Sequence, residues 1–298
     1  LAPVILFTYN RLEETEQTIE ALKKNFLAPK SELFIFSDGP KNHETKDKVK
    51  IVRDYIKSID GFKKITIFES KTNEGLANSI IKGVTKVVNE YGKVIVLEDD
   101  LLTTPNFLDF MNQALDFYQK NKKIISISGY TMSLPSLKNS SKDFYFGYRA
   151  SSWGWGVWKD RWKVIDWDVN DYHNFIKDKQ AVRDFKKGGS DMPRMLSKQI
   201  EGKIDSWAIK FCYHQFKNKM LTLFPTISKL ESIGFSKDAT HTSGTKRFIT
   251  PIDKSHKKEF YFENFKMIDP QLTKEFADFF SIKNRIINQF WQRFNFEK

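Results

Sequence analysis

Three consecutive acidic residues, Glu98, Asp99 and Asp100, follow directly after the apolar run at residues 94–97. Carboxylates this close repel one another and resist removal from water, and a divalent cation relieves both costs. Their oxygens suit Mg2+ or Mn2+, and such sites usually complete the coordination with water and substrate phosphates. An acidic surface turn, which needs no ligand, is the alternative. The triplet predicts a metal site, because ligands bind at the carboxyl ends of buried parallel strands.

A second group of residues suited to ligand binding is aromatic. Trp153 and Trp155 alternate with Gly154 and Gly156, and three further tryptophans follow by residue 167. Two glycines in this alternation fit a helix or a regular strand poorly. The pattern favours a loop that presents flat rings to a ligand such as a sugar, with an ordinary aromatic core as the alternative.

Several other kinds of site lack their motifs in this sequence. There is no P-loop, no Gly-x-Gly-x-x-Gly after the first apolar run and no Gly-x-Ser-x-Gly. A P-loop NTPase and a dinucleotide-dependent oxidoreductase are therefore not supported. The five histidines are scattered, and the single cysteine, Cys212, excludes an internal disulfide framework and a cysteine-based zinc site.

The elements that must position these residues alternate regularly along the first part of the chain. Five short apolar runs, rich in β-branched and aromatic residues, predict strands buried on both faces. These runs are residues 4–7, 33–36, 65–68, 94–97 and 124–127. Apolar residues at helical spacing fill the segments between them, which predicts a mostly parallel sheet with helices on both faces. Polar residues follow each run, so we expect them to gather at one edge of the sheet.

Four of these polar segments together resemble a known family. They are residues 4–11, residues 34–39 with 43–45 beyond, residues 73–76, and residues 98–101 with 104–107. In this order and spacing, residues 1–135 resemble a GT-A-fold glycosyltransferase, close to the bacterial family-2-type enzymes and similar to N-acetylglucosaminyltransferase I. The resemblance implies an α/β fold with a Rossmann-like, mostly parallel sheet flanked by helices. It also implies a metal-dependent, inverting transfer from a nucleotide sugar, with a UDP-sugar as the expected donor.

The resemblance also implies which residues bind the donor. Asp38 is expected to contact the base, Arg11 to lie near the phosphates, and Asp99 to contact ribose or sugar hydroxyls. Glu98 is expected to bind the donor sugar. The remaining expected donor-binding residues are Thr8, Tyr9, Asn10, Asn73 and Gly75.

The same resemblance implies how the metal is held. Asp100 is the expected direct ligand of Mn2+ or Mg2+. His241 is expected to approach the diphosphate or the metal, with a structural role as the alternative. A metal in this position would neutralise negative charge as it builds on the diphosphate leaving group.

The second half of the chain resembles the acceptor region of these enzymes more loosely. The matching segments are residues 154–156, 204–207 and 225–241. An inverting transfer needs one carboxylate to accept the proton of the acceptor hydroxyl, and Asp205 is the expected base. Its structural alternative is a helix N-cap before Trp207. Because Ser206 stands where N-acetylglucosaminyltransferase I has a second acid, Asp191 and Glu231 remain alternative bases.

These segments predict three parts of the chain. We expect a nucleotide-sugar-binding α/β domain at residues 1–135, a smaller acceptor-binding and catalytic subdomain at 136–250, and a C-terminal helical tail at 251–298. From Phe276 onward, apolar residues recur at helical spacing beside several basic residues. We expect this tail to pack on the domain, and the alternative is an amphipathic helix that lies on an anionic membrane surface.

The charge of the chain bears on its partners. Its 298 residues include 49 Lys and Arg against 37 Asp and Glu, which gives a formal net charge of +12. Such an excess favours anionic partners, although Lys-rich surfaces also simply keep proteins soluble. A basic nucleic-acid or membrane-surface binding module is the non-enzyme alternative. The acidic triplet argues against it, because those carboxylates would repel phosphates unless a metal intervened, and we expect no nucleic-acid partner.

A second enzyme class and the cellular location can also be considered. A sugar-nucleotide nucleotidyltransferase shares this kind of sheet, but residues 8–11 lack its glycines.

No apolar run reaches the roughly 20 residues that span a bilayer, and no secretory signal precedes the first run. We therefore expect a cytoplasmic protein, with peripheral contact at the inner membrane face through its tail as the alternative. The expected partners are a nucleotide-sugar donor and a glycan or lipid-linked acceptor in polysaccharide biosynthesis.

Overall fold

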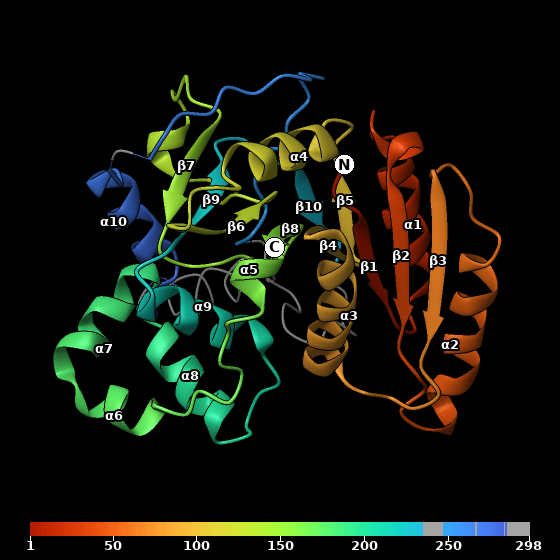
Figure 1. The fold of residues 1–298 in the computed structure, drawn as a ribbon, viewed down its shortest axis with the longest axis horizontal. Helices are drawn as coiled ribbons and strands as arrows, with labels where there is room; N and C mark the ends of the chain where they lie inside the picture. The colour runs from red at the N-terminus through yellow and green to blue at the C-terminus, as the bar shows by residue number, and fades with distance from the viewer. Residues whose placement is uncertain (235–246, 266, 283, 285–298) are drawn as a thin grey trace, which may run out of the picture.

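The computed structural model describes residues 1–234, 247–265, 267–282 and 284. Within these residues, eight strands form one sheet in the order β3-β2-β1-β4-β8-β6-β9-β7, and β10 pairs with β5 in a second sheet (Figure 1). The strands are β1 (Val4–Thr8), β2 (Glu32–Ser37), β3 (Lys64–Glu69), β4 (Lys93–Glu98), β5 (Leu101–Thr103), β6 (Ile124–Ser128), β7 (Phe144–Gly147), β8 (Trp155–Trp158), β9 (Leu221–Pro225) and β10 (Leu230–Ser232). The helices are α1 (Leu12–Lys23), α2 (His43–Ile56), α3 (Leu76–Tyr91), α4 (Phe107–Phe117), α5 (Lys159–Trp162), α6 (Tyr172–Lys177), α7 (Lys179–Phe185), α8 (Met192–Ile200), α9 (Trp207–Lys217) and α10 (Pro270–Phe279).

The half of the sheet from β3 to β4 is parallel, which confirms the prediction. β1 lies between β2 and β4, with Leu6 opposite both Ile35 and Leu97. Successive residues of β1 point to opposite faces, so that Leu6 packs in one core cluster and Ile5 and Phe7 in the other. A strand covered on both faces needs a nearly continuous apolar run, and this is the pattern that made these strands predictable.

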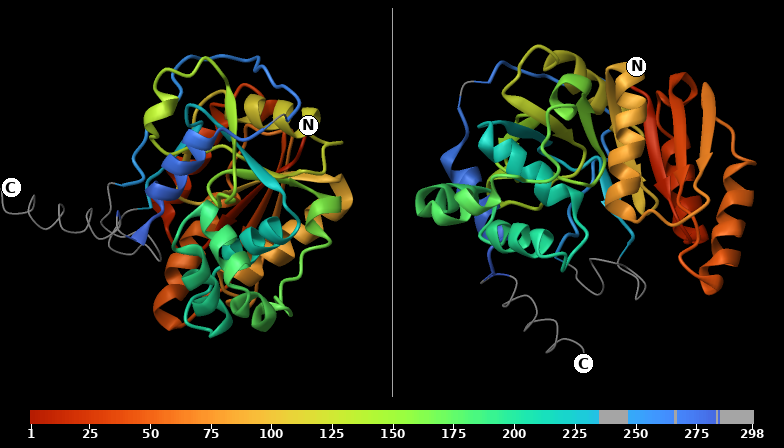
Figure 2. Two further views of the ribbon diagram at one scale, coloured as in Figure 1. Left: turned by 90° about the vertical axis from the view of Figure 1, so that its left-hand side faces the viewer. Right: turned by 60° about the horizontal axis from the view of Figure 1, so that its bottom comes forward.

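Helices cover both faces of the sheet. Apolar residues of α1, α2, α4 and α10 pack into one core cluster. Those of α3 and of α5 to α9 pack into the other. Figures 1 and 2 show α3 running alongside the strands, with the shorter helices α6 to α9 grouped beyond it. The predicted fold class, a mostly parallel α/β sheet flanked by helices, is therefore the observed one.

The segment around Gly154 and Gly156 differs from its prediction. Residues 155–158 form β8, which lies antiparallel between β4 and β6 in the middle of the sheet. Trp155 is 1% exposed, and its ring lies 4.6 Å from that of Trp207, centroid to centroid. A Cβ on Gly156 would come within 3.2 Å of side-chain atoms of Leu115 and Met111 on α4. The expectation of an exposed loop here was wrong, because the glycine serves close packing between the strand and α4.

The strands of the second part of the chain complete the same sheet. β7, β8 and β9 all come from the predicted subdomain at residues 136–250, and each pairs within the eight-stranded sheet. The helices α5 to α9 and strand β10 also belong to that part. The boundary near residue 135 therefore does not divide two sheets, and the division of donor and acceptor roles stays a prediction.

The predicted helical tail is only partly helical in the described residues. Residues 251–265 run as an extended segment over α4, where Gln113 Nε2 donates to Lys258 O and Tyr118 Oη donates to Glu263 O. Helix α10 follows, and its Phe276 packs against Phe224 of β9. This contact agrees with a tail packed on the domain. Residues 285–298, which carry the rest of the amphipathic pattern, lie outside the described residues.

The carboxyl ends of the parallel strands meet at one edge of the sheet. This is the lower edge in Figure 1, where the arrowheads of β2 and β3 point, and the right view of Figure 2 brings it forward. Helix α3 begins at this edge, after the loop that follows β3. Within the described ranges, no helix combines the length and the apolar character needed to cross a bilayer.

Candidate functional site

Predicted site residues from three different strands meet where β1 ends. Asp38 N donates to Thr8 O at 3.0 Å, which ties the loop after β2 to β1. Tyr9 N donates to Asp99 Oδ2 at 3.4 Å, which ties β1 to the acidic triplet after β4. Parallel pairing of β1 with both neighbours makes these contacts possible, because it brings the three carboxyl ends level with one another.

Arg11 and the acidic triplet form the charged centre of this cluster. The Arg11 guanidinium donates to Asp99 Oδ1 and, at 3.1 Å, to Asp100 Oδ2. Burial raises the pKa of Asp99 to about 6, although Arg11 opposes that rise. Burial also raises the pKa of Glu98 to about 8, and the carboxylates of Asp100 and Asp99 add to this shift. Burial alone would lower the pKa of Arg11, but Asp99 and Asp100 raise it overall. Three carboxyl groups therefore share one guanidinium, and a further cation would be favoured here.

The donor set can be tested for its fit to a divalent metal. In the part of the chain that the structure describes, no three His, Cys, Asp or Glu side chains are arranged to hold a metal on their own. Mg2+ and Mn2+ sites that bind nucleotides often use only one or two carboxylates and take their other ligands from phosphates and water. Asp99 and Asp100 fit such a site. His241 lies outside the described residues, so its predicted role is not tested.

Gly234 belongs to the segment at residues 225–241 that resembles the acceptor region, and the structure places it against the same carboxylates, a contact that was not predicted. Strand β10 runs antiparallel to β5, and Ile233 N donates to Asp100 O at 2.9 Å. This pairing places Gly234 beside Asp100, where a Cβ would overlap the carboxylate. Only glycine allows the backbone to approach this closely. A glycine that follows a short strand gives no sequence signal of such a contact.

Asp38 joins the loops that follow β2 and β3. Its Oδ1 accepts from Gly39 N at 2.8 Å and Glu74 N at 2.9 Å, and its Oδ2 accepts from Asn73 Nδ2 at 3.0 Å and Gly75 N at 3.2 Å. A carboxylate offers about four lone-pair positions, so these four donors satisfy it. Asp38 thereby fixes the predicted donor residues Asn73 and Gly75. For the Asp38 side chain to contact a nucleotide base as predicted, the base would have to replace one of these four donors.

Arg53 supports the same two loops and was not predicted from the sequence. Its guanidinium donates to Ser37 O at 3.3 Å, to Asp38 O at 3.2 Å and to Ser70 O at 2.7 Å. The sequence signal that could have found it is a basic residue directly after Val52, within the buried face of α2. Three carbonyl groups from two loops converge on this one side chain, which holds the loops together.

Asp205 reaches this cluster from the second half of the chain. Its Oδ2 accepts from Ala77 N at 3.4 Å, at the start of α3. Helix α3 has Gly75 as its N-cap and makes no side-chain cap of its own, so Asp205 takes that place from a distant segment. The predicted alternative, a cap on α9, is not observed, because Ser206 precedes that helix without a side-chain bond. The exposed carboxylate of Asp205 lies beside the donor loop at Gly75.

The two alternative bases are placed differently. Asp191 is buried, and both its carboxylate oxygens accept from Arg149, at 2.8 and 3.3 Å. Glu231 lies on β10, where it pairs with Leu102 of β5. The neighbouring pair, Ser232 with Leu101, lies next to the acidic triplet. Asp205 is thus the candidate that the structure joins to the predicted donor residues: it accepts from Ala77 N at the start of α3, and Gly75, two residues earlier, donates to Asp38.

The two tryptophans predicted to bind the acceptor are not brought together. Trp155 packs in the core cluster that contains α3 and α9, whereas Trp153 lies against the other cluster. Trp153 is half-buried, with its ring 4.6 Å from Tyr130 and 5.4 Å from Phe248. Trp155 offers no surface to an acceptor in this structure.

Asn10, between Tyr9 and Arg11 in the same turn, is half-buried at the donor edge.

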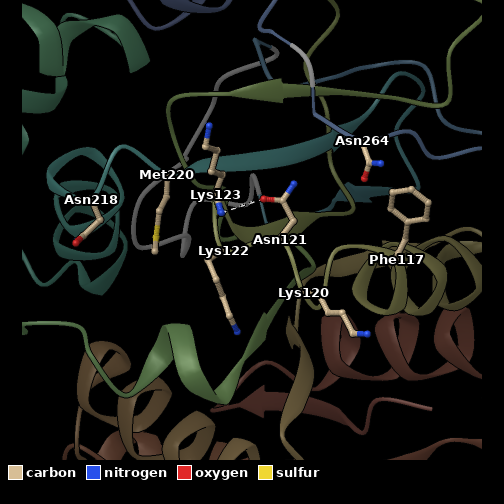
Figure 3. A pocket seen from close by; sticks show the side chains of 8 residues that line it. All are labelled: Phe117, Lys120, Asn121, Lys122, Lys123, Asn218, Met220 and Asn264. Carbon is tan, nitrogen blue, oxygen red and sulfur yellow. Dashed lines mark hydrogen bonds between the residues drawn. The ribbon is translucent and has the colours of Figure 1, made fainter.

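Two cavities lie away from this cluster. The larger, of about 650 Å3, opens at the amino ends of β6 and β9 (Figure 3). It is lined by Phe117, Lys120, Asn121, Lys122, Lys123, Asn218, Met220 and Asn264. The smaller, of about 320 Å3, lies beside β5 and β10 and includes Glu231, Asp253 and His256 in its lining. Neither is lined by Arg11 or the acidic triplet.

The strand order and the polar cluster at the carboxyl edge define a GT-A, Rossmann-like glycosyltransferase fold. The chain belongs to glycosyl transferase family 2, whose sequence model matches residues 4–175. This match contains every predicted donor-binding residue together with Asp100, Trp153 and Trp155. Asp205, Asp191 and Glu231 lie beyond it. Because the chain belongs to a glycosyltransferase family, the two alternatives, a non-enzymatic binding module and a sugar-nucleotide nucleotidyltransferase, are not supported.

Solved structures resemble this chain only distantly. A mannosyltransferase, PcManGT from Pyrobaculum calidifontis in complex with GDP-Man and Mn2+, is 12% identical with a TM-score of 0.37, over 53% of this chain and 44% of that chain. S. aureus TarS is 15% identical with a TM-score of 0.37, over 55% of this chain and 29% of that chain. The chain thus spans less than half the length of either protein. At this distance neither supports a statement about ligands or mechanism. No curated protein matches the chain, and the finer similarity to N-acetylglucosaminyltransferase I stays a prediction.

Proposed function

We propose that the chain transfers a sugar from a nucleotide sugar, a UDP-sugar in the first instance, to a hydroxyl of a glycan or lipid-linked acceptor in polysaccharide biosynthesis. The observation that carries the proposal is the cluster at the carboxyl edge. There, Arg11, Asp38 and Asp99 from the ends of three adjacent strands are joined through β1. Ligands of parallel α/β sheets bind at this edge. The family assignment gives the cluster its reaction class.

Asp100, the predicted ligand, would hold the divalent cation, Mn2+ or Mg2+, with the donor phosphates as further ligands. We propose Asp99 as a second ligand, in place of its predicted contact with ribose or sugar hydroxyls, because Arg11 bridges it to Asp100. When bound, such a cation supplies the positive charge that stabilises a diphosphate leaving group. Arg11 adds a guanidinium suited to phosphate oxygens. The loops fixed by Asp38 and Arg53 form the floor on which the nucleoside would lie. Glu98 completes the donor side as the proposed contact of the sugar.

We assign the acceptor proton to Asp205. In a single displacement, the acceptor oxygen bonds to the anomeric carbon while the bond from that carbon to the phosphate oxygen breaks. The hydroxyl proton moves to the Asp205 carboxylate, and the bonding electrons leave with the nucleoside diphosphate. One displacement inverts the anomeric configuration. The exposed position of Asp205 beside the donor loop suits this role.

The acceptor side of the proposal rests on fewer contacts. Trp153 is the aromatic residue with exposed surface in the predicted pair, and we propose it as an acceptor contact. Metal contact by His241 and peripheral membrane contact by the tail stay predictions, because His241 and residues 285–298 lie outside the described ones. A cytoplasmic location stays a prediction as well.

The proposal is tested by measuring release of nucleoside diphosphate from a panel of UDP- and GDP-sugars, with Mn2+ and with a chelator. We expect at least one UDP-sugar to be turned over, slowly with water and faster with pooled glycan acceptors. Turnover that needs Mn2+ supports the metal assignment. If no donor in the panel yields nucleoside diphosphate under any of these conditions, the proposal is wrong.

A further inference from the structure

Arg11 occupies the carboxylate oxygens that the proposed metal would need. Its Nη2 atom donates to both Asp99 Oδ1 and Asp100 Oδ2. The Asp99 side chain is only 6% exposed and that of Asp100 16%, so Arg11 holds oxygens of acids that are largely shielded from water. Within the described part of the chain, Arg11 is the cation that pairs with both acids.

The geometry points to Arg11 as a built-in competitor of the divalent cation, which couples metal binding to nucleotide binding. This inference rests on the proposed function and concerns the regulation of the same site. A metal that binds Asp99 and Asp100 must displace the guanidinium from their oxygens. Metal alone therefore binds weakly, and the acids become available when Arg11 finds another anion.

The diphosphate of the donor is that other anion. A guanidinium pairs with phosphate oxygens as well as with carboxylates, and often through two hydrogen bonds. The backbone of Arg11 is held in place, because its carbonyl oxygen accepts from Thr15 N at 3.1 Å and from Thr15 Oγ1 at 2.5 Å. Arg11 can therefore change from the carboxylates to a phosphate by rotation of its side chain. Nucleotide binding thus releases the carboxylates, and the metal then enters. By linkage, each ligand must raise the affinity for the other by the same factor.

Other basic residues near the site do not offer the same exchange. Arg53 is engaged with three backbone carbonyl groups. Lys82 pairs with Glu74 at 2.7 Å. Removal of Arg11 should therefore leave the two acids free for a metal. A merely structural ion pair would behave differently, because its loss would destabilise the chain without improving metal affinity.

The test is isothermal titration calorimetry of Mn2+ alone, UDP alone, and Mn2+ at saturating UDP. The proteins are the unaltered chain, Arg11→Met and Arg11→Lys. Lys23→Met is the matched control, because Lys23 also lies near an end of α1 and pairs with two acids, Glu20 and Asp60, away from the site. Circular dichroism checks that each variant is folded. Arg11→Lys keeps the positive charge and serves if Arg11→Met does not fold.

We expect Arg11→Met to bind Mn2+ alone about 10- to 100-fold more tightly than the unaltered chain, the range that a charged hydrogen bond supplies. The ratio of Mn2+ affinities with and without UDP should shrink in parallel. Arg11→Lys should fall between the two, and Lys23→Met should match the unaltered chain. Unchanged or weaker Mn2+ binding by both Arg11 variants would overturn the inference.

The two proposals fail in different ways. If the unaltered chain binds Mn2+ with UDP but neither Arg11 variant gains affinity for Mn2+ alone, the competition by Arg11 is wrong and the proposed function stands. If UDP and GDP fail to bind with or without metal while Arg11→Met gains Mn2+ affinity, the competition stands and the donor assignment is wrong.

Discussion

At the scale of single residues, Asp205 carries two roles that one substitution can separate. It accepts a hydrogen bond from Ala77 N at the start of α3, and it is the proposed acceptor of the substrate proton. An asparagine keeps an oxygen that can accept from Ala77 N but cannot take a proton from the acceptor hydroxyl. The structural role is therefore retained while the chemical role is lost.

Asp205→Asn should leave UDP affinity and the melting temperature close to those of the unaltered chain. Its turnover should fall by about 10²- to 10⁴-fold, the usual contribution of a general base. Glu231→Gln is the matched variant at the alternative acid, and it should keep nearly full turnover. Steady-state assays on both variants decide the matter. Normal turnover in Asp205→Asn, with a large loss in Glu231→Gln, would move the base to β10.

Residue types and order predicted much of the donor edge. Thr8, Asp38 and Asp99 follow apolar runs, and parallel strands bring such residues together. Their actual contacts could not be predicted, because they depend on where loops fold back. Arg53 and Gly234 show this limit. One lies in a helix and the other after a short strand, and only the tertiary fold brings them to the site.

At the scale of elements, the parallel strands were predictable and β8 was not. Continuous apolar runs mark β1 and β4, because helices cover both their faces. Residues 154–156 alternate glycine with tryptophan, which resembles a loop. The glycines are required by neighbours distant in sequence, since Leu230 and Phe107 crowd Gly154. No local pattern carries that information.

Gly154→Ala tests the position of β8 against the matched variant Gly92→Ala. Both glycines have positive φ, 55° and 79°, but nothing lies within 4 Å of a Cβ at Gly92. Gly92→Ala should therefore lower the free energy of unfolding only by the cost of a left-handed alanine, about 1–2 kcal/mol. Gly154→Ala should lose a further ~1–3 kcal/mol, because a Cβ there would overlap buried Leu230. Urea denaturation gives both values. Equal losses would mean that Leu230 of β10 does not pack against Gly154 as described.

At the scale of the whole molecule, a buried ion pair fastens the extended segment at 251–265 to the sheet. Lys229, just before β10, pairs with Asp253, and the two side chains are 5% and 4% exposed. Asp253 Oδ2 also accepts from Asn106 Nδ2 at 3.0 Å, at the start of α4. Lys229 and Ser255 hold the pKa of Asp253 below its usual value, although burial works against this.

Asp253→Asn should lower the free energy of unfolding at pH 7 by about 3–5 kcal/mol, because it leaves Lys229 buried without its partner. The folded-state pKa of Asp253 is lowered, so its contribution is present above the unfolded value of about 3.9 and is lost as pH falls further. The difference between the unaltered chain and the variant should therefore narrow below about pH 4.

Denaturation curves at several pH values measure that difference. Asp54→Asn is the control, because its pair with Lys50 is exposed and its loss should hardly change stability. A difference between the unaltered chain and Asp253→Asn that stays constant down to low pH would contradict the assigned ion pair.

The central claim is that the carboxyl edge binds a nucleotide diphosphate through a metal held by the acidic triplet. Calorimetric titration of UDP, with and without Mn2+, into the unaltered chain and Asp100→Ala tests it most directly, with GDP as the comparison nucleotide. The account predicts tight UDP binding that depends on Mn2+ and is lost in Asp100→Ala, with the fold intact. Unchanged metal-dependent affinity in Asp100→Ala, or no binding of either nucleotide with Mn2+ present, would contradict it.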